Sequence, residues 1–326
     1  STVSRAINNH PDINPETKEM IMQVIKENNY VPNNSARNLK RSDARAIAIL
    51  IKGISNQFFN SMIKVFEEEI QKKKYSLVLQ HVDAWQDETE VALELEKEKR
   101  LRGIIFLGGI ASHSQDQLKK IPVPFVLSTV SLLGKEYKND YSFVSVDDVK
   151  ESCRMTEYLI SQGHEKIALL CSHKNDVSIG ALRLTGYKKA LEAHNIPVDE
   201  RWIRHMDPEL DSYSMESGYR MTKALLEEGV DCTAIFAISD SLAIGAVRAL
   251  IDAGKRVPMD ISVAGFDGTE MAAYYNPSIT TIRQPAEIMA RETIKLLFDS
   301  IKKKTNVQQL IFEGELVPGE SVKKLN

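Results

Sequence analysis

Short polar side chains crowd the first nine residues of the sequence, STVSRAINN. Hydroxyl, amide and guanidinium groups at this density can reach base edges and phosphate oxygens in a DNA groove, because short side chains lose little conformational entropy when they are fixed. A solvated helix start would use the same residue types, so this stretch alone supports the two interpretations about equally. The residues concerned are Thr2, Ser4, Arg5 and Asn8.

The sequence motifs of common enzyme chemistries are missing. No G-x-G-x-x-G follows an apolar run, and neither a Walker A sequence nor a G-x-S-x-G elbow occurs. The seven histidines show no H-x-x-x-H or cysteine-paired spacing, so we predict no metal site and no cofactor. His164 directly precedes an expected strand, where a structural role is expected. These absences favour a protein that is not an enzyme.

Charge is distributed unevenly along the 326 residues, which carry a formal net charge of −3. Residues 1–46 contain seven Lys or Arg and five Asp or Glu, a net charge of +2, which leaves −5 for the remainder. A small basic segment on an acidic body suits an anionic partner for that segment alone.

Features of membrane or secreted proteins are also missing from the sequence. No apolar run approaches the length of a bilayer span, and residues 1–12 lack the basic start and apolar core of a signal peptide. Cys153, Cys171 and Cys232 are odd in number and form no C-x-x-C pair. We expect them to be reduced and buried, in a cytoplasmic protein that does not contact membranes.

Two helices are expected to position the polar residues of the N-terminal segment. Asn14 followed by Pro15 predicts a helix start, with proline at the first helical position. The apolar residues that follow repeat with helical spacing and give one apolar face: Met20, Ile21, Val24 and Ile25. The helix should stop at residues 30–34, and residues 35–41 form at most a marginal helix on their own.

From residue 46 onward, apolar runs of strand length alternate with longer amphipathic segments. Near-continuous apolar strands separated by helices predict parallel sheets with helices on both faces. Two such series over about 280 residues predict two similar α/β lobes. The expected strands are residues 46–51, 76–82, 103–109, 123–129, 143–146, 166–172, 233–239 and 261–266.

The ordered motifs of the first forty residues resemble the DNA-binding headpiece of the lactose/galactose repressor (LacI/GalR) family. Residues 1–8 match S/T-V-S-R-x-x-N, the recognition helix of that family's helix-turn-helix, and residues 30–39 match Y-x-P-N-x-x-A-R-x-L, the start of its hinge helix. The resemblance implies that Leu39 is the apolar wedge inserted between central base pairs. It implies further DNA contacts at Thr2, Ser4, Arg5 and Asn8 in the major groove and at Asn33, Ser35 and Arg37 in the hinge. The family's first helix is missing, so we expect a helix-turn-helix truncated at its N-terminus that binds DNA poorly.

The body continues the resemblance in five loops: residues 54–59 (ISNQFF), 182–187 (LRLTGY), 236–240 (FAISD), 265–268 (GFDG) and 280–285 (TTIRQP). Loops at strand ends are where open α/β sheets bind ligands. Carboxylates can accept hydrogen bonds from sugar hydroxyls, a guanidinium can donate to them, and an aromatic ring can pack against a sugar face. The implied effector-binding residues are Phe59, Arg183, Phe236, Ser239, Asp240 and Asp267. Asp240 could instead cap the helix that follows it.

Several positions depart from the family pattern. Ser239 stands where many sugar-binding members carry asparagine, Gly268 replaces a second acid, and residues 128–130 (STV) replace Asp-Arg. These changes predict a pocket less acidic than that of typical pentose or hexose sensors. The effector could then be a modified or phosphorylated sugar, or not a sugar.

The resemblance implies an α/β fold with two similar Rossmann-like lobes of the periplasmic-binding-protein type and a small all-α helix-turn-helix headpiece. The expected divisions are residues 1–45 for the partial headpiece and hinge helix, 46–147 with 279–306 for the N-terminal lobe, and 148–278 with 307–326 for the C-terminal lobe. We expect a transcriptional repressor that binds palindromic operator DNA as a homodimer, with contacts along residues 56–73 and 248–256. A small effector, expected to be a carbohydrate, would bind between the lobes and change the affinity for DNA. The alternative is a solute-binding protein that senses a small molecule without binding DNA.

Overall fold

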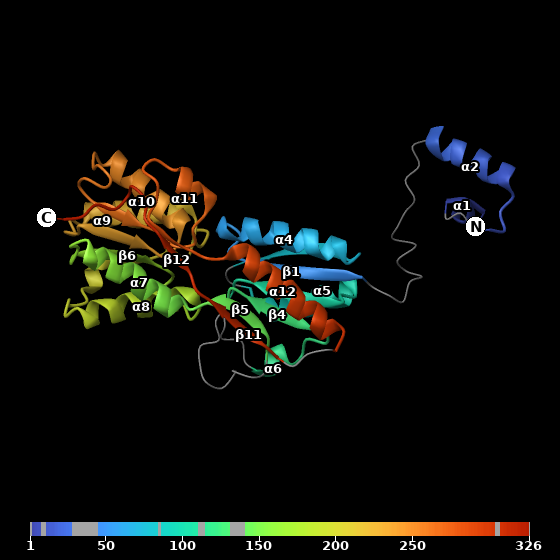
Figure 1. Ribbon diagram of the computed structural model, residues 1–326, viewed down its shortest axis with the longest axis horizontal. Coiled ribbons are helices and arrows are strands. Elements are labelled where there is room, and N and C mark those ends of the chain that lie inside the picture. The colour runs from blue at the N-terminus through green and yellow to red at the C-terminus, as the bar shows by residue number, and fades with distance from the viewer. Residues whose placement is uncertain are drawn as a thin grey trace. The chain divides into compact units, whose positions relative to one another are not determined.

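The computed structural model describes residues 2–7, 11–27, 45–83, 86–109, 115–130, 141–303 and 307–325. The chain divides into two compact units, Ser1–Ala44 and Arg45–Asn326 (Figure 1). Each unit is described separately below.

The first unit contains the helices α1 (Thr2–Ile7) and α2 (Pro15–Glu27), which pack on each other. The predicted start of α2 is confirmed, because the backbone N–H of Glu16 donates to Asn14 Oδ1 at 2.9 Å and proline is the first helical residue. The predicted apolar face of α2 is only partly covered within this unit: Ile21 is half-buried, whereas Met20 is 63% exposed.

The first lobe of the second unit is built on a six-stranded parallel sheet with the strand order β11-β5-β4-β3-β1-β2. Alternate residues of β1 point to opposite faces, so Ile49 packs under α4 (Phe58–Lys72) and α12 (Ala286–Ile301), and Leu50 packs against α5 (Glu88–Lys99) and α6 (Gln115–Leu118). The strands are β1 (Ala46–Lys52), β2 (Ser76–Val82), β3 (Gly103–Leu107), β4 (Phe125–Ser128), β5 (Phe143–Val146) and β11 (Gln309–Phe312).

The second lobe has a four-stranded parallel sheet with the order β7-β6-β8-β9. Its strands are β6 (Ile167–Cys171), β7 (Ile203–His205), β8 (Ala234–Ala237) and β9 (Ser262–Ala264). Its helices are α7 (Asp148–Ser161), α8 (Ile179–Ala193), η2 (Glu200–Trp202), α9 (Met215–Glu227), α10 (Asp240–Asp252) and α11 (Glu270–Tyr274). Two of these helices approach each other closely at Gly245, because a Cβ at that position would overlap the carbonyl oxygen of Met215.

Three segments join the lobes, and two of them pair as an antiparallel ribbon of β10 (Thr281–Arg283) and β12 (Glu315–Val317). The predicted parallel α/β architecture is confirmed, and every expected strand is present. The assignment of residues 307–326 to the second lobe is wrong for β11, which pairs with β5 in the first sheet. On its last passage, the chain therefore leaves the first lobe only after Phe312.

The three cysteines are free, as expected, with Cys171 and Cys232 buried. Cys153 is only half-buried and lies on α7, where its thiol is 3.7 Å from the carboxylate of Glu157. Among the described residues, no helix is long and apolar enough to cross a membrane.

Candidate functional site

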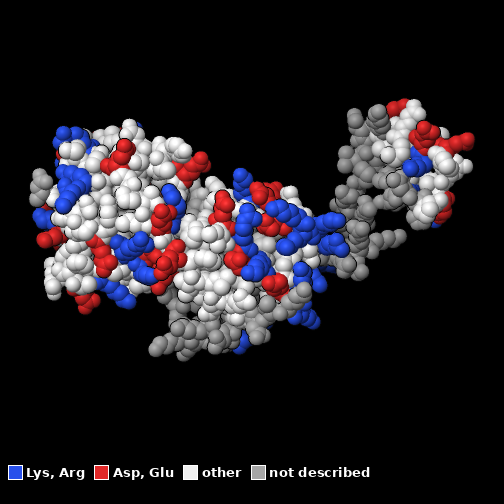
Figure 2. All heavy atoms as spheres, in the orientation of Figure 1, with Lys and Arg blue, Asp and Glu red and all other residues white. Residues whose placement is uncertain are grey.

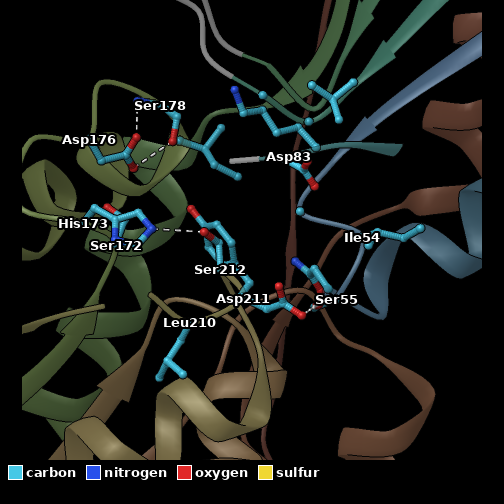
Figure 3. Close-up of a pocket in the computed structure, with 18 of the residues that line it drawn as sticks. Ile54, Ser55, Asp83, Ser172, His173, Asp176, Ser178, Leu210, Asp211 and Ser212 are labelled. Carbon is cyan, nitrogen blue, oxygen red and sulfur yellow. Dashed lines mark hydrogen bonds between the residues drawn. The ribbon is translucent and has the colours of Figure 1, made fainter. Parts of the chain in front are cut away.

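A cleft of about 390 Å³ lies between the two lobes, at the carboxyl ends of both parallel sheets (Figure 3). Its first-lobe wall is formed by the loops after β1, β2 and β3, and its second-lobe wall by the loops after β6 and β7. Parallel sheets bring these strand ends to one edge, which is where such folds bind ligands. The volume lies in the range of sites for small molecules, roughly 300–1,000 Å³.

Acidic side chains dominate the charge of the cleft lining. Lys52 is the one lysine among the described lining residues, and it is already paired: its ammonium lies 3.2 Å from Glu88 Oε2, and both side chains are less than a tenth exposed. An anionic ligand would therefore find no unpaired lysine or arginine among the described lining residues. That the pocket is less acidic than that of typical pentose or hexose sensors stays a prediction. The carboxylates of the lining are Asp83, Asp176, Glu209 and Asp211.

Hydrogen bonds hold the second-lobe wall in place. Asp176 accepts from the backbone N–H and the hydroxyl of Ser178 at 2.8 and 2.7 Å (Figure 3). The Nδ1 atom of His173 lies 3.1 Å from the carbonyl oxygen of Met206, which can only accept, so Nδ1 carries the proton. Its Nε2 atom lies 3.1 Å from the hydroxyl oxygen of Ser212. The two contacts orient the imidazole beside the cleft.

One hydrogen bond joins the two walls directly. The hydroxyl of Ser55, from the loop after β1, donates to Asp211 Oδ2 at 3.2 Å, from the loop after β7 (Figure 3). The pair is exposed, so it is worth only about 1 kcal/mol and can be exchanged for bonds to a ligand. A ligand in the cleft therefore competes with, or replaces, a contact between the lobes.

Below the cleft, a buried polar cluster fastens the lobes together. Asn56 of the first lobe donates to Asp267 Oδ2 at 3.0 Å, and Gln284 donates to Asp267 Oδ1 at 2.8 Å. Arg183 donates to Asp148 at 2.9 Å and lies 3.5 Å from Asp267, with its guanidinium over the ring of Phe266. The space left among these groups is about 10 Å³, too little for a sugar. We name this cluster the buried joint.

Burial sets the protonation behaviour of the carboxyls at and beside the buried joint. It raises the pKa of Asp267 to about 6, although the charge of Arg183 and the hydrogen bond from Asn56 act to lower it. Burial also raises the pKa of Asp240 to about 7, and the negative charge of Asp267 adds to this shift. Two carboxyls in this part of the second lobe therefore take up protons much more readily than ordinary aspartates.

The structure separates the six predicted effector residues. Phe59 lines the cleft, and Arg183 and Asp267 belong to the buried joint. Phe236, Ser239 and Asp240 lie elsewhere in the second lobe and do not line the cleft.

The three residues away from the cleft have structural partners, and their predicted place in the pocket is corrected. Phe236 is fully buried in β8, where its ring packs in the core. Ser239 caps α10 by accepting from the backbone N–H of Leu242 at 3.3 Å, so the predicted capping role of Asp240 falls to its neighbour. Asp240 instead accepts from the Thr269 N–H and the Thr281 hydroxyl, each at 2.6 Å.

Most of the cleft residues belong to loops that sequence motifs did not indicate. Tyr213 is the most informative of them, because its backbone is left-handed, with φ at 60°, and its buried hydroxyl has as its polar neighbour the Ser178 hydroxyl, which already donates to Asp176. Strained backbone is costly and gathers at functional sites. The polar residues 209–214 (ELDSYS) could have indicated this part of the cleft, but β7, the strand that positions them, was not predicted.

The predicted DNA-binding residues are only partly described. Thr2 and Arg5 are exposed on α1, and Arg5 forms an exposed ion pair with Asp12 at 3.4 Å. Ser4 is part of α1. The remaining predicted contacts lie outside the described residues: Asn8, Asn33, Ser35, Arg37 and Leu39.

Comparison with known proteins agrees along nearly the whole chain. Residues 1–33 match the family model of bacterial regulatory proteins, lacI family, and residues 156–322 match the periplasmic binding protein-like domain. The HTH-type transcriptional regulator MalR of Clostridium butyricum is 41% identical, over 98% of this chain and 95% of its own length.

Solved structures give the same result. The complex of the transcriptional regulator CelR with cellobiose is 28% identical, with a TM-score of 0.73 over 98% of this chain and 94% of that one. The lac repressor dimer bound to operator and the anti-inducer ONPF is 25% identical, with a TM-score of 0.73 over 99% and 94%. These relatives are transcriptional regulators and not enzymes. The chain belongs to the lacI family of bacterial transcriptional regulators.

Proposed function

We propose that this chain is the subunit of a homodimeric repressor that binds palindromic operator DNA and responds to a neutral sugar held in the cleft. The observation that carries the proposal is the cleft itself, whose two walls come from different lobes and meet through Ser55 and Asp211. A ligand there contacts both lobes at once, so its binding energy depends on their relative orientation. Such differential binding is the physical requirement for coupling two sites.

The chemistry of the lining favours a neutral polyhydroxylated ligand. Carboxylates accept hydrogen bonds from hydroxyl groups, and the hydroxyls of Ser55 and Ser212 in the lining can both donate to a ligand and accept from it. The apolar walls at Phe59 and Ile54 can contact the C–H face of a sugar ring. A phosphorylated sugar fits poorly, because Lys52 is held by Glu88. The cellobiose complex of the CelR regulator supports a sugar by analogy.

Strand β1 links the cleft to the DNA-binding segment. Its carboxyl end continues into the cleft wall at residues 52–56, and its amino end is preceded by Arg45, where the chain arrives from the N-terminal unit. A strand buried between two layers moves as a rigid rod, so a shift of the wall is transmitted to Arg45. Coupling free energies of about 1–3 kcal/mol are typical of such regulators and would change DNA affinity roughly 5- to 150-fold.

On the DNA, we assign major-groove contacts to Thr2, Ser4, Arg5 and Asn8. The hinge contacts are assigned to Asn33, Ser35, Arg37 and Leu39. One headpiece reads only half of a palindrome, so the proposal requires two copies of the chain.

The second lobe offers an apolar surface for a second copy. Tyr274 is 85% exposed on α11, and Met271 and Ile251 are 40% and 46% exposed on α11 and the neighbouring α10. Exposed apolar side chains on adjacent elements are typical of protein interfaces. This surface adjoins the predicted contact segment 248–256.

Two measurements on the same protein test the proposal. A thermal-shift panel of neutral monosaccharides and disaccharides, their phosphates and nucleobases should give a rise in Tm for a neutral sugar, because a ligand at 100 times its Kd adds about 2.7 kcal/mol of stability. Fluorescence anisotropy with palindromic duplexes selected from a random pool should show salt-dependent binding that this sugar changes.

The outcomes separate the parts of the proposal. A rise in Tm with sugar phosphates alone would overturn the neutral-sugar assignment. Stabilisation by a sugar without any DNA binding would support the solute-binding alternative. An Asp176→Ala variant should lose the thermal shift, whereas Asp260→Asn, which removes an exposed carboxylate outside the cleft on the same lobe, should keep it.

A further inference from the structure

Lysine and arginine gather at the edge of the first sheet where its strands begin. All six strands are parallel, so every turn that leads from a helix into a strand lies at this edge. The four such turns, residues 73–75, 100–102, 119–124 and 302–308, contain nine Lys or Arg and no Asp or Glu. Figure 2 shows basic side chains at the end of the body where α4 and α12 terminate.

The corresponding turns of the second lobe have a different charge. Residues 162–166, 194–202, 228–233 and 253–261 contain four Lys or Arg and six Asp or Glu. Both lobes have the same architecture, so the excess of positive charge is not a general property of turns between helices and parallel strands. It is specific to the first lobe.

The backbone conformation at these turns is unfavourable for lysine and arginine. After α4, α5 and α12 the chain adopts a left-handed conformation at Lys74 (φ 61°), Arg100 (φ 52°) and Lys303 (φ 55°). This conformation favours glycine, because a Cβ crowds the neighbouring carbonyl. The second lobe follows that preference, with left-handed residues after α7, α8, α9 and α10 at Gly163, Asn195, Gly229 and Gly254.

Attraction to the helix dipole does not explain this difference between the lobes. Cations near a helix C-terminus stabilise the helix, and such an effect would apply equally to both lobes. The last turns of α4 and α5 nevertheless contain basic residues, whereas those of α7 to α10 contain none. The first lobe therefore keeps cations where glycine would fit better.

These side chains are accessible to a partner. The basic turn residues that the structure describes are all exposed, as is Arg45, and together they form what we call the basic face: Arg45, Lys73, Lys74, Arg100, Arg102, Lys119, Lys120, Lys302 and Lys303. Lys74, Arg100 and Lys303 form no ion pair with any residue that the structure describes, in contrast to Lys166 and Arg256 of the second lobe, which pair with Asp231 and Asp260.

The basic face is also where the DNA-binding segment is attached. The carbonyl of Arg45 accepts from Ser76 N–H at 2.7 Å, and Arg102 N–H donates to the carbonyl of Ala46 at 2.7 Å, so Arg45 lies between two of the basic turns. The preceding residues connect it covalently to α1 and α2. The chain of the DNA-binding segment therefore joins the body at this face.

We propose that the basic face binds the phosphate backbone of DNA beside the operator half-site. The inference rests on the proposed function, which brings the DNA to this face. With six strands about 4.8 Å apart, the sheet edge is roughly 24 Å wide, which is shorter than one turn of B-DNA at about 34 Å. The face contacts phosphates without reading bases, so it adds affinity and salt dependence but no sequence preference.

The test uses the protein with a complete helix-turn-helix headpiece, as wild type and as the triple variant Lys74→Gly, Arg100→Gly, Lys303→Gly. Binding to a fluorescein-labelled duplex of mixed sequence, about four helical turns long, is followed by anisotropy from about 50 to 200 mM KCl. The slope of log K against log salt should become shallower by about 0.9 for each phosphate that is no longer neutralised, which is up to about 2.7 for three phosphates. The Tm of the variant should be unchanged or higher, because glycine fits the left-handed positions. A loss of DNA affinity therefore cannot be attributed to unfolding.

The matched control removes the same charge from the corresponding turns of the second lobe, as Lys166→Gln, Lys255→Gln, Arg256→Gln. Its salt slope should equal that of the wild type. Equal decreases in both triple variants would overturn the proposal, since net charge alone would then account for them.

Two further outcomes decide between targets. If the wild type binds DNA with salt dependence and the first-lobe variant binds identically, the role of the basic face in DNA binding is refuted while the proposed function stands. A wild type without DNA binding refutes the proposed function itself. Co-sedimentation with phosphatidylserine vesicles provides the comparison with a membrane surface. Loss of vesicle binding with intact DNA binding in the first-lobe variant would reassign the face to anionic lipid.

Discussion

Replacing Asp240 with Asn should change how the stability of the protein depends on pH. Asp240 is fully buried at the start of α10, where its two oxygens accept from Thr269 and from the Thr281 hydroxyl. An asparagine has nearly the same shape: its oxygen can accept from Thr269, and its amide can donate to the hydroxyl oxygen of Thr281. The substitution therefore removes the ionisation while keeping the packing.

The size of the effect follows from the pKa of Asp240, which burial and the charge of Asp267 raise from 3.8 to about 7. Between these two values the folded protein binds a proton that the unfolded chain has lost, so the free energy of unfolding falls as pH rises through this window. At about 1.4 kcal/mol per pKa unit, the wild type should lose about 2–3 kcal/mol from this group between pH 5 and pH 8. The variant should lose nothing from it.

Urea unfolding of both proteins at pH 5 and pH 8, followed by circular dichroism, measures this difference directly. The control is Asp260→Asn, an exposed carboxylate of the same lobe whose pKa is lowered by Arg256. That group titrates well below pH 5, so its removal should shift stability by a constant across the window. If the free energy of unfolding changed equally with pH in the wild type and in Asp240→Asn, the claim that the folded protein binds a proton at Asp240 would be refuted.

Three further variants test other parts of the structure. Tyr213→Phe removes a buried hydroxyl whose polar neighbour is Ser178, so titration calorimetry should show weaker sugar binding while stability changes by no more than about 1 kcal/mol. Asp211→Asn keeps an oxygen for Ser55 but removes the charge, so sugar affinity should fall about tenfold; tighter binding would indicate an anionic effector. Tyr274→Asp places a charge on the exposed surface of α11, so sedimentation should show a weaker dimer with stability within about 0.5 kcal/mol of the wild type.

The architecture could be predicted from sequence because buried parallel strands consist of nearly uninterrupted apolar residues. Residues 46–51 and 103–107 are apolar at nearly every position, and each forms a fully enclosed strand. β7 escaped prediction because only Ile203 of its three residues is apolar. β11 was not predicted because it is short, and its membership of the first sheet depends on a pairing with β5 that is remote in sequence.

The site was harder to predict, since the motif residues Arg183 and Asp267 hold the lobes together, whereas other residues line the cleft. Arg183 and Asp267 carry the chemistry expected of ligand contacts, but Asn56 and Gln284 already saturate the Asp267 carboxylate. Those partners lie 211 and 17 residues away along the chain, so no local pattern reveals them. The residues that face the open cleft, such as Asp176, lie in loops whose composition is ordinary.

This division suggests how the lobes can move relative to each other. Breaking a charged, buried hydrogen bond of the joint would leave its partner unsatisfied at a cost of about 1–3 kcal/mol or more, and several such bonds meet at Asp267. The exposed Ser55–Asp211 bond at the cleft costs far less to exchange. A sugar that forms a few hydrogen bonds can therefore rearrange the cleft walls but cannot open the joint. We expect the lobes to rotate about the buried joint, with β1 carrying the motion of the cleft wall to Arg45 and the basic face.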